Sequence, residues 1–187
     1  LVYEKEENYK PFSLTANSDA NSKYVLTEDL TITQRQASIF LGNFRGILIN
    51  PDGYTITYKT ENYAPYRVPY LLFNENHGII DGLKINVISS ANVPFTNFDG
   101  LVTENYGVIS NCEITGEVFV DGLNEESSIT TVFPQDGYVF NNKASLAVYT
   151  NENLYPWQEK KELTFDDYTE KNKILTDCLV FKDNEIE

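Results

Sequence analysis

The sequence predicts an all-β fold, and more specifically a parallel β-helix (solenoid) of about four coils. The first observation behind this prediction is an internal repeat: the type of segment found at 71–85 recurs at 101–114 and, interrupted, at 147–153 and 172–180. The second is a break, once in each copy, in the alternation of apolar and polar residues that is typical of a strand. The break falls at a residue type that adopts a left-handed backbone at low cost, so each short strand should bend into the next and the copies should wind into stacked coils.

Equivalent positions of the three copies hold apolar residues that we expect to point inward, each stacked on its counterpart in the next coil. These residues are Ile80, Leu83 and Ile85 in the first copy, Ile109, Cys112 and Ile114 in the second, and Leu175, Cys178 and Val180 in the third. The expected turn residues are Gly82, Asn111 and Asp177, and the polar residues before them, expected to point outward, are Asp81, Ser110 and Thr176.

The whole chain is expected to form one domain around this solenoid. Its 187 residues and 41% hydrophobic content suit a single core, which we place at residues 24–187. Residues 1–23 mix charged residues with Ser, Asn and Asp, so we expect a linker or a loosely attached lead-in segment there. Segments 24–33 and 44–58 each divide into two short strands, the second around a P-D-G turn.

Two segments do not fit a coil and are predicted to be loop insertions. Residues 60–70 contain Pro65 and Pro69, and proline cannot donate a hydrogen bond to a central ladder. Residues 154–171 separate the two halves of the third copy. Binding residues in repeat proteins tend to lie on such loops, because the loops vary while the scaffold repeats.

Charge and composition argue against several classes of function. The formal net charge of −14 repels a polyanion, so nucleic acid is not an expected partner. The longest apolar runs, such as SIFLG and YLLF, are far shorter than the roughly 20 residues of a membrane-spanning helix, so no membrane span is expected in this segment. The chain starts at Leu1 without a signal-peptide pattern, and we interpret it as a segment of a longer chain with flanking domains.

Several segments together resemble a known family. YVLTEDLTI, FRGILINPDGYTI, LLFNENHGIIDGLKI and LVTENYGVISNCEITGEV resemble the repeat series of GLUG-motif bacterial surface proteins, over roughly residues 24–120 and 144–182. Those proteins are large extracellular polypeptides, among them immunoglobulin A-cleaving metallopeptidases, in which such repeats form parallel β-helical segments. The resemblance implies this architecture and an extracellular or cell-surface location in a bacterium, and it implies no activity for this segment.

The sequence shows no residue pattern typical of a metal centre. His77 is the only histidine, it precedes Gly78, and its counterpart is Tyr106, so an exposed turn position is its expected environment. H-E-x-x-H and paired cysteine motifs are absent, so the segment is not expected to hold the centre of a metallopeptidase. We expect no cofactor and no metal site, with calcium at the surface left open.

The alternative is a carbohydrate-active β-helix, of the polysaccharide lyase or glycoside hydrolase type. A lyase needs a strong base beside calcium-binding carboxylates, and a hydrolase needs two carboxylates at a fixed separation. The equivalent positions Asp81, Ser110 and Thr176 do not build a column of carboxylates, and the neighbours Asp166 and Asp167 lie in the second insertion. Fold analogy alone is weak support for catalysis, so we expect a protein that is not an enzyme.

Aromatic residues are the most suggestive candidates for ligand binding. Tyr63, Tyr66 and Tyr70 lie in or beside the first insertion, and Tyr155 and Trp157 lie in the second. Exposed aromatic rings flanked by Asn, Asp and Glu bind sugar rings, and aromatic residues are also enriched at protein interfaces. The competing interpretation is that tyrosine is a good strand residue and that these rings pack the loops onto the coil.

The two cysteines hold the same position in their copies and would meet if those copies were neighbours. A strand spacing of about 4.8 Å would allow a disulfide. Two stacked inward side chains point the same way, however, and the dihedral angle near 90° that a disulfide needs would strain the ladder. We therefore predict that Cys112 and Cys178 are buried free thiols, with the disulfide as the alternative.

These inferences lead to one expected function and one alternative. The chain is expected to be a non-catalytic β-helical module of a bacterial extracellular or cell-surface protein, acting in adhesion, in ligand or substrate recognition, or as a rigid spacer. Its expected partner is a host or cell-wall glycan or a protein ligand. The alternative is the carbohydrate-active β-helix, which would cleave polysaccharides.

Overall fold

All the regular structure in the described part of the chain is β-strand. The computed structural model describes residues 8–13, 19–33, 43–59, 72–88, 101–120, 137–150, 161–162 and 184–186. Strands β1 to β16 lie in these ranges, and no helix occurs among the same residues. Within this part of the chain there is accordingly no helix long and apolar enough to cross a membrane.

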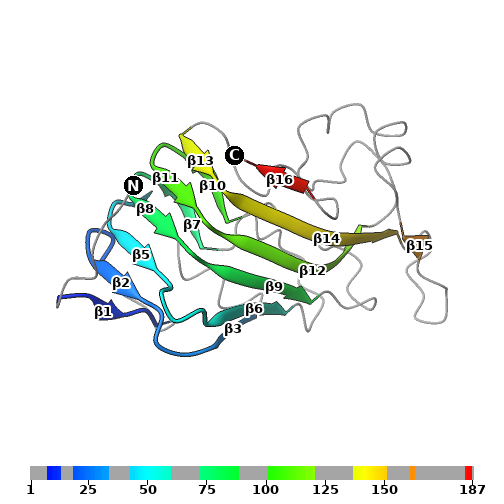
Figure 1. Ribbon diagram of the computed structural model, residues 1–187, viewed down its shortest axis with the longest axis horizontal. Coiled ribbons are helices and arrows are strands. Elements are labelled where there is room, and N and C mark those ends of the chain that lie inside the picture. The colour runs from blue at the N-terminus through cyan, green and yellow to red at the C-terminus, as the bar shows by residue number, and fades with distance from the viewer. Residues whose placement is uncertain are drawn as a thin grey trace.

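The strands form three sheets, which we name A, B and C (Figure 1). Sheet A contains, in spatial order, β1 (Lys10–Pro11), β2 (Lys23–Val25), β5 (Ile47–Ile49), β8 (Ile79–Asp81), β11 (Val108–Ser110) and β13 (Tyr138–Phe140). Sheet B contains β3 (Leu30–Thr33), β6 (Thr55–Lys59), β9 (Lys84–Ile88), β12 (Glu113–Val120), β14 (Asn142–Thr150) and β15 (Lys161–Glu162), with β16 (Asn184–Ile186) also paired to β14. Sheet C contains β4 (Asn43–Phe44), β7 (Phe73–Asn76) and β10 (Val102–Asn105).

The chain visits the three sheets in a fixed order. It passes from β2 in sheet A to β3 in sheet B and β4 in sheet C, and it repeats this order with β5, β6 and β7 and again with β8, β9 and β10. We call each such pass a unit. Strands of successive units pair in parallel, and only β15 and β16 pair with β14 in the antiparallel sense among the described strands. The prediction of an all-β fold is confirmed, and its sheets are parallel.

The register confirms the predicted columns for the first two copies of the repeat. Ile80 pairs with Ile109, and Ile85 pairs with Ile114. All four side chains are at most 1% exposed. The apolar residues of one unit therefore stack on those of the next, as the repeat pattern predicts.

The predicted third copy is wrong in its first half. In the unit after Ile109 and Ile114, the strand partners are Val139 and Ala144. Residues 147–150, predicted to open the third copy, are instead the end of β14. Residues 172–180, the predicted second half, lie outside the described residues.

The reason for this error is a polar residue at an otherwise apolar position in the unit that contains β13 and β14. Asn142 follows the turn of that unit, as Cys112 does in the preceding one. Its Oδ1 accepts a hydrogen bond of 2.8 Å from the backbone N–H of Cys112, and its Nδ2 donates one of 2.9 Å to the carbonyl of Ile109. A buried amide thus occupies a position that is apolar in the neighbouring units. The pattern of apolar residues therefore does not reveal this copy of the repeat.

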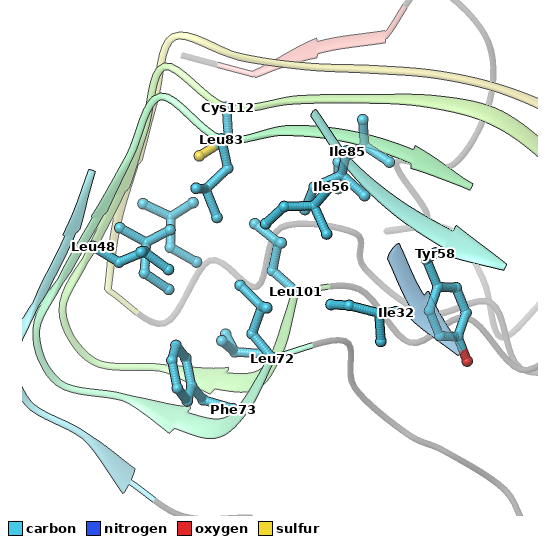
Figure 2. Packing of buried hydrophobic residues seen from close by; sticks show 14 of the residues in the cluster. Ile32, Leu48, Ile56, Tyr58, Leu72, Phe73, Leu83, Ile85, Leu101 and Cys112 are labelled. Atoms are coloured by element: carbon cyan, nitrogen blue, oxygen red, sulfur yellow. The ribbon is translucent and has the colours of Figure 1, made fainter. Parts of the chain in front are cut away.

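The core lies between the three sheets and changes character along the stack (Figure 2). At the N-terminal end it is aromatic, because the rings of Phe44 and Phe73 stack with centroids 4.3 Å apart and that of Tyr24 lies 6.4 Å from Phe44. Farther along it is aliphatic, with Leu83 and Cys112 buried in the same region. Burial raises the pKa of the Cys112 thiol to about 12.

Glycine is required where the chain turns from sheet C into sheet A. A Cβ on Gly78 would lie 2.0 Å from the carbonyl oxygen of Gly46, and one on Gly107 would lie 2.1 Å from that of Gly78. These glycines, together with Gly137 in the next unit, form a column in which each residue lies directly on the backbone of the one before. We call this edge of the molecule the glycine corner.

The turn from sheet A into sheet B confirms the predicted left-handed residues. Gly82 has φ 73° and Asn111 has φ 54°, and Asn141 with φ 55° takes the same role between β13 and β14. Ser110, predicted to point outward, is only 2% exposed, since its hydroxyl donates a hydrogen bond of 2.7 Å to Asp81. Ser110 is therefore buried although it directly follows the inward-pointing Ile109 on the strand, so its low exposure does not contradict the predicted outward orientation.

Part of the predicted linker belongs to the fold. Lys10 and Pro11 pair in parallel with β2, and Phe12 is 2% exposed, with its ring packed edge-on against Tyr24. Burying an aromatic ring of this size is energetically favourable, so Phe12 packs against the core although its neighbours in the sequence are charged and polar. The predicted insertion 60–70 lies outside the described residues, as does 154–171 apart from β15.

Candidate functional site

The aromatic residues proposed for ligand binding from the sequence are not placed by the structure. Tyr63, Tyr66, Tyr70, Tyr155 and Trp157 all lie outside the described residues. Two nearby tyrosines are described: Tyr58 is 2% exposed and Tyr54 packs against the core. Both are therefore part of the packed fold.

A candidate site lies along the glycine corner. Residues three before, one before and one after Gly46, Gly78 and Gly107 point outward, as the alternation with the residues between them indicates, and so does the residue after Gly137. We call this surface the corner face. It consists of three rows: Asn43, Glu75 and Glu104; Arg45, His77 and Tyr106; and Ile47, Ile79, Val108 and Tyr138.

Two stacked rings form the middle of the corner face. The centroids of His77 and Tyr106 lie 4.9 Å apart with an interplanar angle of 22°. Backbone hydrogen bonds fix this contact: the N–H of His77 donates to the carbonyl of Phe44, and that of Tyr106 donates to the carbonyl of Asn76, both at 2.7 Å. His77 is exposed, as predicted, and Tyr106 is 52% exposed.

Each ring lies just after the end of a strand and is hydrogen-bonded to a carboxylate two residues earlier in the chain. His77 Nε2 lies 2.8 Å from Glu75 Oε2, and the hydroxyl of Tyr106 donates to Glu104 Oε2. Glu75 and Glu104 are directly opposite each other in neighbouring parallel strands. The corner face therefore holds two carboxylates of like charge, each held in place by an aromatic donor.

An aliphatic row borders these polar groups on sheet A. Ile47, Ile79 and Val108 are half-buried on its outer face and are aligned by the strand register. Tyr138 continues the row and is 73% exposed. A ligand on the corner face would meet oxygen acceptors on one side, planar polar groups in the middle and apolar side chains on the other.

The side chains of the corner face offer several kinds of contact. The described residues contain no group of three or more His, Cys, Asp or Glu side chains placed to hold a metal ion. The carboxylates can accept hydrogen bonds from hydroxyl or amino groups, and an exposed tyrosine can pack against an apolar surface or a cation.

The sequence holds a signal that would have identified these residues. Glycine precedes an apolar or aromatic residue at Gly46, Gly78, Gly107 and Gly137, and the residues around it alternate between outward and inward positions. Only the spatial stacking of the units, however, brings Glu75 beside Glu104. Comparisons with known proteins found no matching protein-family model, no matching curated protein and no matching solved structure.

Proposed function

We propose that this chain is a non-catalytic parallel β-helical module of an extracellular or cell-surface bacterial protein, and that it recognises a ligand through the corner face. The β-helical interpretation is supported by the order in which the chain visits sheets A, B and C and by the in-register columns Ile80–Ile109 and Ile85–Ile114. An experimental structure with the strands of sheets A and B in an antiparallel sandwich would contradict it.

One observation supports the recognition role above the others. Tyr106 and Tyr138 are 52% and 73% exposed although the strands around them are well packed, and Tyr106 lies beside a carboxylate, Glu104, to which its hydroxyl donates a hydrogen bond. Exposed aromatic side chains with ordered polar neighbours are typical of binding surfaces. A rigid spacer has no need of them.

A binding panel with matched variants tests this role. The full chain would be applied to immobilised glycans and purified extracellular proteins, alongside Tyr106→Ala/Tyr138→Ala. The control is Thr31→Ala/Thr57→Ala, which alters two paired residues on the outer face of sheet B. We expect the tyrosine variant to lose roughly tenfold or more in affinity for the bound ligand and the control to bind like the parent. Equal binding by both variants would refute the corner face as the site.

The carbohydrate-active alternative has one observation in its favour. Neighbouring parallel strands are about 4.8 Å apart, comparable with the roughly 5–5.5 Å between the carboxyl groups of retaining glycoside hydrolases. Glu75 and Glu104 are such neighbours. Both are partly exposed and paired with similar donors, however, whereas that mechanism needs two carboxyl groups in different environments.

A hydrolysis screen separates the two candidates. The parent, Glu75→Gln and Glu104→Gln would be incubated with neutral and acidic polysaccharides, with detection of reducing ends. The recognition role predicts no product with any of the three proteins. Product formation that disappears in either variant would establish the enzymatic alternative.

A further inference from the structure

A stack of repeated units offers a surface on which a second copy of the chain can continue the stack. Successive units pair in parallel and in register, so a head-to-tail contact would place β13 of one copy beside β2 of the next, and β14 beside β3. Such a contact joins two different surfaces, and its repetition produces an open filament. Three features of the described residues block this contact.

The first feature lies in sheet A, at the N-terminal end of the stack. Strand β1 pairs with β2, with Pro11 opposite Val25, and so occupies the edge that β13 of a second copy would need. β1 is itself a poor edge for further pairing, because it has only two residues, Lys10 and Pro11. Short strands, lysine and proline are the means by which proteins protect sheet edges from pairing with other chains.

The second feature lies in sheet B, at the opposite end of the stack. Strand β16 pairs with residues 142–144 of β14, and β15 pairs with residues 149–150, both in the antiparallel sense. Strands of successive units in this sheet pair in parallel. β15 and β16 therefore take up the edge of β14 that β3 of a second copy would need, and they do not continue the pattern of the units.

The third feature is a side chain at the start of the glycine corner. A Cβ on Gly46 would lie 1.8 Å from the carbonyl oxygen of Ser22, just as one on Gly78 would lie 2.0 Å from that of Gly46. Ser22 thus holds the corner position of the first unit, and its own Cβ points to where the corner carbonyl of a preceding unit would lie. Its hydroxyl donates to Asp19 Oδ2 at 3.0 Å, and Lys10 Nζ donates to the same hydroxyl at 3.1 Å.

We propose that β1, Ser22, β15 and β16 are caps that keep copies of this chain from stacking head to tail. Each such contact is blocked from both sides, by β1 and Ser22 of one copy and by β15 and β16 of the other. Terminal units that differ from the internal ones have this role in repeat proteins. The inference is independent of the proposed recognition function, because the corner face runs along the side of the stack and the caps lie at its ends.

Substitutions in the full chain open one end at a time. The N-open chain carries Lys10→Pro, which removes an N–H group from β1, and Ser22→Gly, which removes the Cβ at the corner. The C-open chain carries Glu162→Pro and Glu185→Pro, which remove N–H groups from β15 and β16. Circular dichroism melts first establish that each chain is folded. A chain without a cooperative melt is replaced by Ser22→Gly alone or by Glu185→Pro alone, with the same expected result.

Sedimentation velocity in about 0.5 M salt, where charge repulsion is screened, measures the association. Each chain alone has one capped end and should remain a monomer of 21.3 kDa. An equimolar mixture should form a 1:1 complex of twice that mass. A chain with all four substitutions should form oligomers whose mean mass increases with concentration. A mixture of the two folded chains that remains monomeric would overturn the proposal, as would self-association of either chain alone.

A matched control isolates the contribution of the corner. A chain with Lys10→Pro alone keeps the Cβ of Ser22, so its only difference from the N-open chain is the side chain at that position. We expect it to bind the C-open chain roughly tenfold more weakly or not at all, since the Cβ meets the backbone of the neighbouring copy. Equal affinities would show that the two copies do not meet in the register of the units, and the proposal would be wrong.

Discussion

The glycine column makes a residue-scale prediction about stability. We expect Gly107→Ala to lower the free energy of unfolding by about 2 to 3 kcal/mol, because the new Cβ would lie 2.1 Å from the carbonyl oxygen of Gly78 and the backbone must shift. Urea unfolding followed by circular dichroism measures the change. Gly82→Asn is the control: a Cβ there meets no atom closer than 3.6 Å, and asparagine already adopts the same backbone conformation at Asn111. This control should cost less than about 1 kcal/mol, and equal losses would contradict the steric argument.

Burial of Cys112 predicts an unreactive thiol. Cys112 is a free cysteine with 1% exposure, so in a Cys178→Ser background it should react with a thiol reagent only after denaturation, without any reductant. The free-thiol prediction is confirmed for Cys112, and Cys178 lies outside the described residues. The equivalent positions on either side of Cys112 are occupied by Leu83 and Asn142. Rapid labelling of the folded protein would contradict the burial of Cys112.

The raised pKa of Cys112 also predicts a loss of stability in alkaline solution. Its ordinary pKa of 9.0 applies to the unfolded chain and rises to about 12 in the fold, so between these values the unfolded state releases a proton that the folded state retains. The contribution is complete below pH 9 and declines as the pH rises toward 12, by up to about 1.4 kcal/mol per pH unit. Compared with Cys112→Ala, the parent should therefore lose free energy of unfolding more steeply between pH 9 and 11. Parallel pH profiles would show that this thiol does not contribute.

At the scale of the element, strand β7 contains a matched pair of asparagines. Asn76 is fully buried: its Nδ2 donates to Asn105 Oδ1 at 2.9 Å and to the carbonyl of Val108 at 3.3 Å, and its Oδ1 accepts the N–H of Gly78 at 3.0 Å. Asn76→Leu leaves these groups buried without a partner and should cost about 3 kcal/mol or more. Asn74→Leu, at an exposed position of the same strand, should change stability by less than about 0.5 kcal/mol. Thermal melts of the two variants that coincide would contradict the role assigned to Asn76.

The turns from sheet A into sheet B show how much of the fold could be predicted from the sequence. The residue types at Gly82 and Asn111 reveal a left-handed turn without any knowledge of neighbours, and the apolar residues on either side give the inward face. The buried amides could not be predicted in this way. Asn142 is polar, and only the unpaired backbone groups of Cys112 and Ile109 in the adjacent unit explain why it lies in the core.

The candidate site was harder to predict for a related reason. The sequence-based prediction places the sugar-binding aromatic residues on proline-rich and charged segments, where the sequence departs from the repeat. The corner face instead uses repeated positions, and a row such as Glu75 and Glu104 exists only after two units stack in register. A residue's neighbour in the next unit is a property of the three-dimensional register, which no local pattern specifies.

At the scale of the whole molecule, the stacked columns make the units depend on one another. Ile109 is fully buried between Ile80 and Val139, so Ile109→Asp places a charge without a partner in the core. Its cost is comparable with the roughly 5 to 15 kcal/mol of stability of an ordinary domain, and we expect the native circular dichroism spectrum to be lost. Val108→Asp, one residue earlier on the half-exposed outer face, should retain a cooperative melt. If Ile109→Asp melts like the parent, the inward assignment is wrong.

The ladders also determine how the protein would respond to a pulling force. The hydrogen bonds between units run along the direction in which the units stack. A force that pulls the first units away from the last therefore acts along these bonds. It breaks the ladder between one pair of units at a time and does not shear all the ladders together. Each detached unit releases the chain between paired residues, which is 29 residues from Asn76 to Asn105, or about 100 Å of extended chain. A protein built in this way would lengthen in discrete steps under load, and the units still stacked would keep their portion of the corner face intact.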